Sequence, residues 1–124
     1  MQLARCTVKF LRDEQGNALL EGVGFAAVAF GLLLTLGMNA LNLEREALAL
    51  QSIARNSLRY YSMHPDKDIE GVVASFQRES ILASQTIQII FSCSNQDCIT
   101  KGNLLWLELR TDELEAKAFG VIVE

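Results

Sequence analysis

A single carboxylate, Glu21, stands directly before a run of uncharged residues from Gly22 to Leu43. An ionised carboxylate at the centre of a membrane-inserted helix costs about 2.5 to 3.5 kcal/mol, and less near the helix end. In an apolar medium it is tolerated when a cation pairs with it. Glu21 therefore needs a cationic partner, which makes it the first candidate functional residue.

Two of the three cysteines, Cys93 and Cys98, lie beyond the apolar run with four residues between them, whereas Cys6 precedes the run. Thiols in an oxidising compartment pair, and closing a six-residue loop in this way contributes about 2 kcal/mol through chain entropy. A metal site is the alternative for the two thiolates. It would need further Cys or His ligands, and His64 is the only histidine. We therefore expect a disulfide between Cys93 and Cys98, and no metal.

The remaining residue types argue against several classes of function. The sequence has no Ser/His/Asp or Cys/His arrangement, no glycine loop to cradle a phosphate and no paired carboxylates in a plausible cleft, so we expect neither an enzyme nor a cofactor. The net charge of −4 and the lack of a Lys/Arg cluster argue against a nucleic-acid partner. Asp112, Glu113 and Glu115 lack the ligand spacing of a calcium loop and are interpreted as a solvated turn.

The apolar run predicts the element that positions Glu21. Of the 124 residues 50% are hydrophobic, a high share for a small soluble domain, and the excess is concentrated at residues 22–43. As a helix this run is roughly 33 Å long, against about 30 Å for the hydrocarbon core of a bilayer. We therefore predict one long helix at residues 17–64, with a membrane span at about 18–43.

The charges that flank the span predict its orientation. Arg5, Lys9 and Arg12 precede it, whereas only Arg45 follows it closely, among acidic neighbours. Because cytoplasmic flanks carry the excess of Lys and Arg, residues 1–16 are expected in the cytoplasm. The protein is thus expected in the inner (cytoplasmic) membrane, in contact with lipid, with its C-terminal part periplasmic or extracellular.

Beyond the span, the spacing of apolar residues predicts further helix. A stripe at spacings of three and four continues the long helix to about His64, where Pro65 disfavours helical geometry in the residue before it. Acidic residues after Pro65 suit a first helical turn, so a second, amphipathic helix is expected at residues 66–83. The stripe comprises Leu43, Ala47, Leu50, Ala54, Ser57 and Tyr61, and the face of the second helix comprises Ile69, Val72, Val73, Phe76, Ser80 and Ala83.

Three strands should follow, because the apolar period then changes from helical to alternating. They are expected at residues 85–93, 104–110 and 118–123, with turn-forming residues between them. In the second strand Leu105, Leu107 and Leu109 should share one face, and Trp106 is interpreted as a core residue or an exposed contact. The sequence thus predicts an α+β protein with a long N-terminal helix. Its small head, residues 65–124, would place one amphipathic helix on a three-stranded antiparallel sheet stapled by the disulfide.

The entrance of the span resembles the type IV prepilin pattern. A basic leader, a Gly, four further residues, a Glu and an apolar helix occur in that order, with Gly16 and Glu21 at the two motif positions. In prepilins a membrane aspartic peptidase cuts after the Gly, and the Glu meets the new α-amino group of a neighbouring subunit. The resemblance therefore implies a leader at residues 1–16, cleavage between Gly16 and Asn17, and a role for Glu21 in assembly.

Within this superfamily the sequence is similar to the TadE/TadF-like pseudopilins of the tight adherence (Tad) pilus machinery. The segment from Arg12 to Glu21, followed by a span rich in Leu, Ala, Val and Gly, fits the entrance of these proteins. They also carry a long helix, a helical segment and β-strands with a Cys pair. Gly22 stands where the family commonly has a bulky apolar residue, and where the small Flp pilin has Tyr, which favours a minor subunit. The implied partners are a prepilin peptidase, other pilin or pseudopilin subunits and the inner-membrane assembly platform.

Two other interpretations remain open on the sequence. The apolar run could belong to the signal peptide of a secreted protein, cut after Ala40, although Met38 suits such a site poorly. Alternatively, the chain could be an unprocessed single-pass anchor whose outer domain binds another envelope partner. The three interpretations differ in the first residue of the mature chain, which would be Asn17, Leu41 or Met1.

Overall fold

The computed structural model describes residues 14–123, with side chains from residue 17 onward. Its elements are, in order, α1 (Glu14–Met63), α2 (Ile69–Arg78), β1 (Gln88–Cys93), β2 (Leu104–Arg110) and β3 (Glu115–Val121). The predicted α+β class is confirmed, with a long N-terminal helix, a second short helix and a three-stranded antiparallel sheet. The chain divides into two compact units, with the boundary between Leu41 and Asn42.

The N-terminal unit is, in the described chain, the first part of α1. This part is helical because it is rich in Leu and Ala, both strong helix formers, and contains no Pro. Its large apolar side chains are exposed, with Phe25 at 81%. The predicted leader lies outside the described residues except for 14–16, which α1 includes, so the helix begins three residues before the predicted start at Asn17.

The second part of α1 contributes one side of the core of the C-terminal unit. Leu43 is 44% exposed and stays outside this core. The helix ends at Met63, one residue before the predicted end, and His64 N–H still bonds to the carbonyl oxygen of Tyr60 at 3.0 Å before Pro65 follows. Four residues of the predicted stripe are buried, namely Leu50, Ala54, Ser57 and Tyr61.

The second helix is shorter than predicted, since α2 covers Ile69–Arg78 rather than residues 66–83. It begins later because Asp68 is its N-cap, with a carboxylate that accepts a hydrogen bond from Gly71 N–H at 3.3 Å. The predicted face is nevertheless correct over its first turns, where Ile69, Val72 and Val73 are buried.

The early end of α2 follows from hydrogen bonds of Gln77. Its side-chain amide donates to the carbonyl oxygens of Leu82 and Gln85, at 3.0 and 2.6 Å, and holds the chain after α2 in turns. Leu82 is fully buried, whereas Ala83, predicted for the helix face, is exposed. A packed turn therefore replaces the last helical turn that the sequence pattern predicts.

The sheet has the strand order β1-β2-β3, and both pairs are antiparallel. β2 has the predicted bounds, and Leu105, Leu107 and Leu109 are buried as the alternation predicts. β1 begins at Gln88, three residues later than predicted. β3 covers Glu115–Val121 instead of residues 118–123, because alternating alanines and charges form a half-buried strand without a continuous apolar run.

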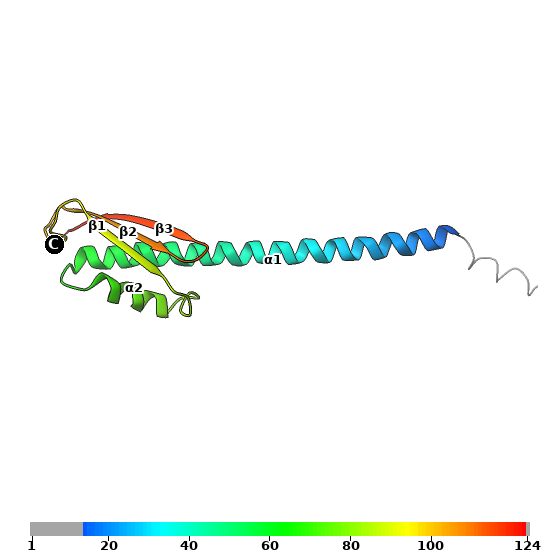
Figure 1. Ribbon diagram of the computed structural model, residues 1–124, viewed down its shortest axis with the longest axis horizontal. Coiled ribbons are helices and arrows are strands. Elements are labelled where there is room, and N and C mark those ends of the chain that lie inside the picture. Colours follow the sequence, from blue (N-terminus) through cyan, green and yellow to red (C-terminus); the bar gives the residue numbers. More distant parts are fainter. Residues whose placement is uncertain (1–13, 124) are drawn as a thin grey trace, which may run out of the picture. The chain divides into compact units, whose positions relative to one another are not determined.

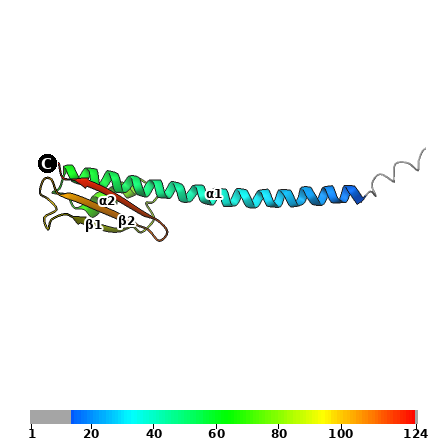
Figure 2. The ribbon, with the colours of Figure 1, turned by 90° about the horizontal axis from the view of Figure 1, so that it is seen from above.

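One face of the sheet packs on the second part of α1. The ring of Tyr61 meets the ring of Phe91 on β1 edge to face, with centroids 5.0 Å apart. On β3, Gly120 lies so close to α1 that an added Cβ would be 3.1 Å from Cδ2 of Leu58. Figure 1 shows α2 beside the same part of α1, and Figure 2 shows β3 as the strand nearest to α1. The core of this unit therefore needs residues from α1, α2 and all three strands.

Candidate functional site

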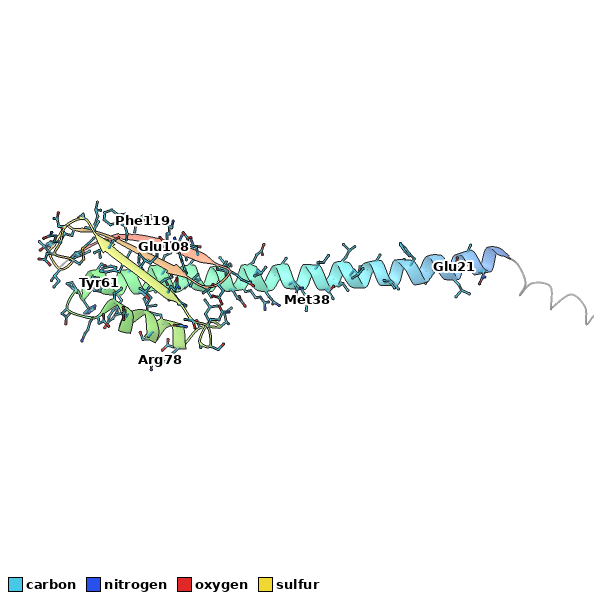
Figure 3. The ribbon with its side chains drawn as sticks, viewed as in Figure 1. Glu21, Met38, Tyr61, Arg78, Glu108 and Phe119 are labelled. Carbon is cyan, nitrogen blue, oxygen red and sulfur yellow. A yellow bond between two sulfur atoms is a disulfide. The ribbon has the colours of Figure 1, made fainter. Side chains whose placement is uncertain are left out.

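Glu21 lies one helical turn after Asn17, so that both side chains share one face of α1. The bond between Gly16 and Asn17, where the resemblance implies cleavage, lies in the first turn of the same helix. Both side chains are exposed, and within residues 17–123 no Lys or Arg forms an ion pair with Glu21, which Figure 3 shows near the start of α1. The carboxylate is thus accessible to a cation of another chain.

The large apolar side chains that follow Glu21 are all exposed. Between Gly22 and Leu43 their exposed fractions run from 44% at Leu43 to 81% at Phe25. An apolar surface of this extent is unfavourable in water, so a bilayer or other helices must cover it. Within the described chain, α1 is the one helix that is long and apolar enough to span a membrane, and its length and composition are consistent with the predicted membrane anchor.

The expected disulfide is present in the C-terminal unit. Cys93 at the end of β1 is bonded to Cys98 in the following loop, with Cα atoms 5.5 Å apart. In the closed loop the carboxylate of Asp97 accepts hydrogen bonds from the Thr100 hydroxyl at 2.7 Å and from Ile99 N–H at 3.0 Å. Bonds to the charged form favour ionisation, and they hold the pKa of the Asp97 carboxyl below its usual value.

Asn103 ties this loop to the sheet, and its sequence context does not distinguish it from an ordinary turn residue. Its side chain is buried. The amide group donates to the carbonyl oxygen of Asp97, and the amide oxygen accepts from the Asn95 side chain at 2.9 Å. A buried polar side chain with both ends bonded fixes the loop conformation.

The sheet face turned away from α1 has a charged end. Glu108 and Arg110 on β2 face Lys117 and Glu115 on β3. Two ion pairs cross between the strands, Arg110 with Glu115 at 3.5 Å and Lys117 with Glu108 at 3.9 Å. Along β3, Lys117 also pairs with Glu115 at 2.7 Å. The bond to Lys117 lowers the pKa of Glu115, and the same bond raises the pKa of Lys117. Glu115 was predicted to lie in a solvated turn, but it belongs to β3.

The other end of that face is apolar. Trp106 pairs with Phe119, and Leu104 pairs with Val121, across the β2–β3 register. Phe119 is 71% exposed, and Leu104 and Val121 are 49% and 43% exposed. Trp106 itself is half-buried, so it is neither a core residue nor a fully exposed contact, and it lies on the surface that Figure 3 marks with Phe119.

The acidic and sulfur-containing side chains do not form a metal site in the part of the chain that the structure describes. No group of three or more His, Cys, Asp or Glu residues lies close enough to hold an ion there. His64, the lone histidine, stacks on Tyr60 at the end of α1, with ring centroids 4.5 Å apart.

Comparisons of the chain with protein-family models, with curated proteins and with solved structures find no match. Its function is therefore inferred from its own residues.

Proposed function

We propose that the protein is a minor pilin or pseudopilin that a prepilin peptidase cuts between Gly16 and Asn17. It then assembles through α1 into a Tad-type pilus, or into the initiation or tip complex of that pilus. The observation that carries this proposal is the exposed apolar surface of α1 from Leu19 to Leu43, in which Glu21 is the single charged residue. A helix with such a surface can lie in lipid and can later exchange the lipid for neighbouring helices.

The charge pair gives the assembled helices their register. Cleavage would create an α-amino group at Asn17, a cation one turn away from Glu21 on the same helix. In the low dielectric of a helix bundle, that cation and the Glu21 carboxylate of a neighbouring subunit stabilise each other, and each would be costly alone. The ion pair therefore stabilises the one axial offset between neighbouring subunits that brings the α-amino group next to the carboxylate.

Small residues on α1 allow the helices to approach closely. Gly24, Gly31 and Gly37 lie on the apolar part, and a Cβ added at any of them would have open space within 4 Å, apart from the neighbouring backbone of α1 itself. Interfaces between helices in a membrane are rich in such residues, because small side chains let backbones approach and pack. The surface is thus suited to helix packing as well as to lipid.

The disulfide supports the proposed location of the C-terminal unit outside the cytoplasm. Bonds such as Cys93–Cys98 persist in oxidising compartments and are rare where thiols are kept reduced. Residues 1–16 would then face the cytoplasm, where the peptidase acts on the leader. The assembly platform in the inner membrane would extract the processed helix from the lipid.

The first amino acid of the membrane-extracted protein tests this proposal. Intact-mass and N-terminal analysis should give a chain that starts at Asn17 in cells with an active prepilin peptidase. Gly16→Ala should leave the leader attached, because a peptidase that needs close backbone approach at this position cannot accommodate the added methyl group. The matched control Gly22→Ala should be processed normally.

Two results would contradict the proposal. A start at Met1 in the same cells would identify an unprocessed anchor, and a start at Leu41 would identify an ordinary signal peptide. Both are separated from the proposed product by mass alone.

A further inference from the structure

The strand β3 has one unpaired edge within the described chain, because it is the last strand of the order β1-β2-β3. Ile122 N–H donates to the carbonyl oxygen of Asn103 at 3.1 Å, which fixes the phase of the β2–β3 ladder. Backbone groups in an antiparallel ladder alternate between the two sides of a strand. Those of Lys117, Phe119 and Val121 therefore face the open edge. An edge of this kind is a template for another strand.

A groove of about 610 Å³ runs beside this edge, between β3 and α1. Its wall on α1 is lined by Arg55, Leu58, Arg59 and Ser62, and its wall on β3 by residues 117–120. Val123 N–H donates to the carbonyl oxygen of Ser62 at 3.2 Å, so the chain closes one end of the groove. The β3 edge and the groove together, here called the β3 groove, form a site in which backbone pairing and side-chain contacts can occur together.

The β3 groove is positively charged on its α1 side. Arg55 and Arg59 are exposed and lie one helical turn apart, on the same face. Within residues 17–123 neither forms an ion pair, since the pairs of this sheet involve Arg110 and Lys117. Two cations thus stay uncompensated on a chain whose net charge is −4. A ligand with carboxylates would pair with these two guanidinium groups and neutralise their charge.

The period of a strand determines where those carboxylates must stand. Side chains of an added strand would point alternately to the two faces of the sheet. On one face they would meet Arg55 and Arg59, and on the other they would lie beside Phe119 and Val121, at the apolar end of the outer surface. A strand in which acidic and apolar residues alternate would therefore place its carboxylates beside the arginines and its apolar side chains beside Phe119 and Val121.

We propose that the β3 groove binds an extended acidic segment of a partner protein, which adds a fourth strand to the sheet. Its carboxylates pair with Arg55 and Arg59, and its apolar side chains extend the surface of Trp106 and Phe119. A second copy of this chain fits less well, because antiparallel pairing of two β3 edges would set two Arg55/Arg59 pairs against each other. The proposal does not depend on cleavage at Gly16, since every residue of the groove lies beyond the span.

Binding of a synthetic peptide to the full chain in detergent micelles tests the charge requirement. The probe is a fluorescent heptapeptide that alternates Val and Glu, and its affinity is measured by polarisation. The double variant Arg55→Glu/Arg59→Glu should bind the probe at least tenfold more weakly, and so should the wild type with a probe in which Lys replaces Glu. Arg78→Glu, which changes an exposed arginine on α2, should bind within twofold of the wild type.

Methylation of the probe backbone tests strand addition without changing the protein. In an antiparallel pairing the N–H groups of the Val residues face β3, and in a parallel pairing those of the Glu residues do. One probe is N-methylated at every Val and a second at every Glu. Affinity should fall at least tenfold for one of the two and change less than threefold for the other.

Three results would overturn the proposal. Equal affinity of the two methylated probes would mean that no strand forms at the edge. Unchanged binding by the double arginine variant, with its melting curve intact, would mean that the cations do not select the ligand. A dimer of the full chain that excludes the probe and survives the arginine changes would identify a second copy as the occupant.

Discussion

The ionised carboxylate of Asp97 helps to hold the chain that follows β1, together with the disulfide and the bonds of Asn103. The ionised carboxylate accepts hydrogen bonds from the Thr100 hydroxyl and from Ile99 N–H. These bonds favour the charged form, so they lower the pKa of the Asp97 carboxyl. A carboxyl with a lower pKa in the folded state than in the unfolded state stabilises the fold above the unfolded pKa, near 3.8. That contribution is lost as the pH falls through the lower, folded value.

Thr100→Val should raise the pKa of Asp97 toward 3.8, because the hydroxyl that donates to the carboxylate is removed. A carboxyl-carbon NMR titration of the full chain in micelles measures this directly. The control Thr86→Val changes an exposed threonine that precedes β1 and should leave the titration of Asp97 unchanged. An identical pKa in Thr100→Val would show that the hydroxyl bond does not hold the loop.

At the scale of the elements, the bounds of β2 could be predicted because its leucines alternate strictly, whereas those of β3 could not. Residues 115–118 alternate between charged residues and alanine but carry little apolar volume, and therefore form no apolar run by which the strand could be predicted. Packing within the fold makes Ala116 and Ala118 core residues. The start of α2 was missed for a related reason. Asp66 and Asp68 are both acceptable caps, and the buried position of Ile69 decides between them.

The predicted sites show the same division. The pairing of Cys93 with Cys98 could be predicted because both lie beyond the apolar run, on the side expected to be oxidising, whereas Cys6 precedes it. Arg55 and Arg59 could not be predicted as part of a groove, because exposed arginines on a helix are typical of a solvated face. Their role emerges only when β3 lies beside α1.

Gly120→Ala should destabilise the C-terminal unit by about 1 to 3 kcal/mol, because the new Cβ would lie 3.1 Å from Cδ2 of Leu58. Leu58 is only 2% exposed and has little room to move. Urea unfolding of the full chain in micelles, followed by the fluorescence of Trp106, the only tryptophan, measures the change in the free energy of unfolding.

Gly71→Ala is the matched control for this change, because a Cβ there meets nothing nearer than Oδ2 of Asp68 at 3.8 Å. Alanine favours helix, so this variant should be stabilised by up to about 1 kcal/mol. A Gly120→Ala protein as stable as the wild type would refute the close approach of α1 and β3.

At the scale of the whole molecule, α1 continues from Glu14 to Met63 and belongs to both units. Its first part offers an exposed apolar surface, and its second part offers a stripe that the sheet buries. The proposed assembly through the first part would therefore not require the second part to unfold.

Glu21→Ala should leave processing at Gly16 intact but reduce the amount of protein in sheared filaments, relative to the membrane fraction, by at least about tenfold. The reason is that an unpaired α-amino group inside a helix bundle costs about 1 to 3 kcal/mol or more. Quantitative immunoblots of the two fractions measure this ratio. Glu44→Ala, which changes another exposed carboxylate of α1, should behave as the wild type. Full incorporation of Glu21→Ala would exclude the charge pair from assembly.

The buried positions of Leu50 and Ile122 have a consequence for the newly made chain. Both belong to one core, with exposed fractions of 0% and 1%, so that core cannot close before the ribosome has reached residue 122. At about 5 to 20 residues per second, synthesis of the intervening segment takes on the order of 4 to 14 s. Throughout that interval the apolar stripe of α1 has no sheet to cover it. The stripe is thus open to non-native contacts until the last strand of the core has been made.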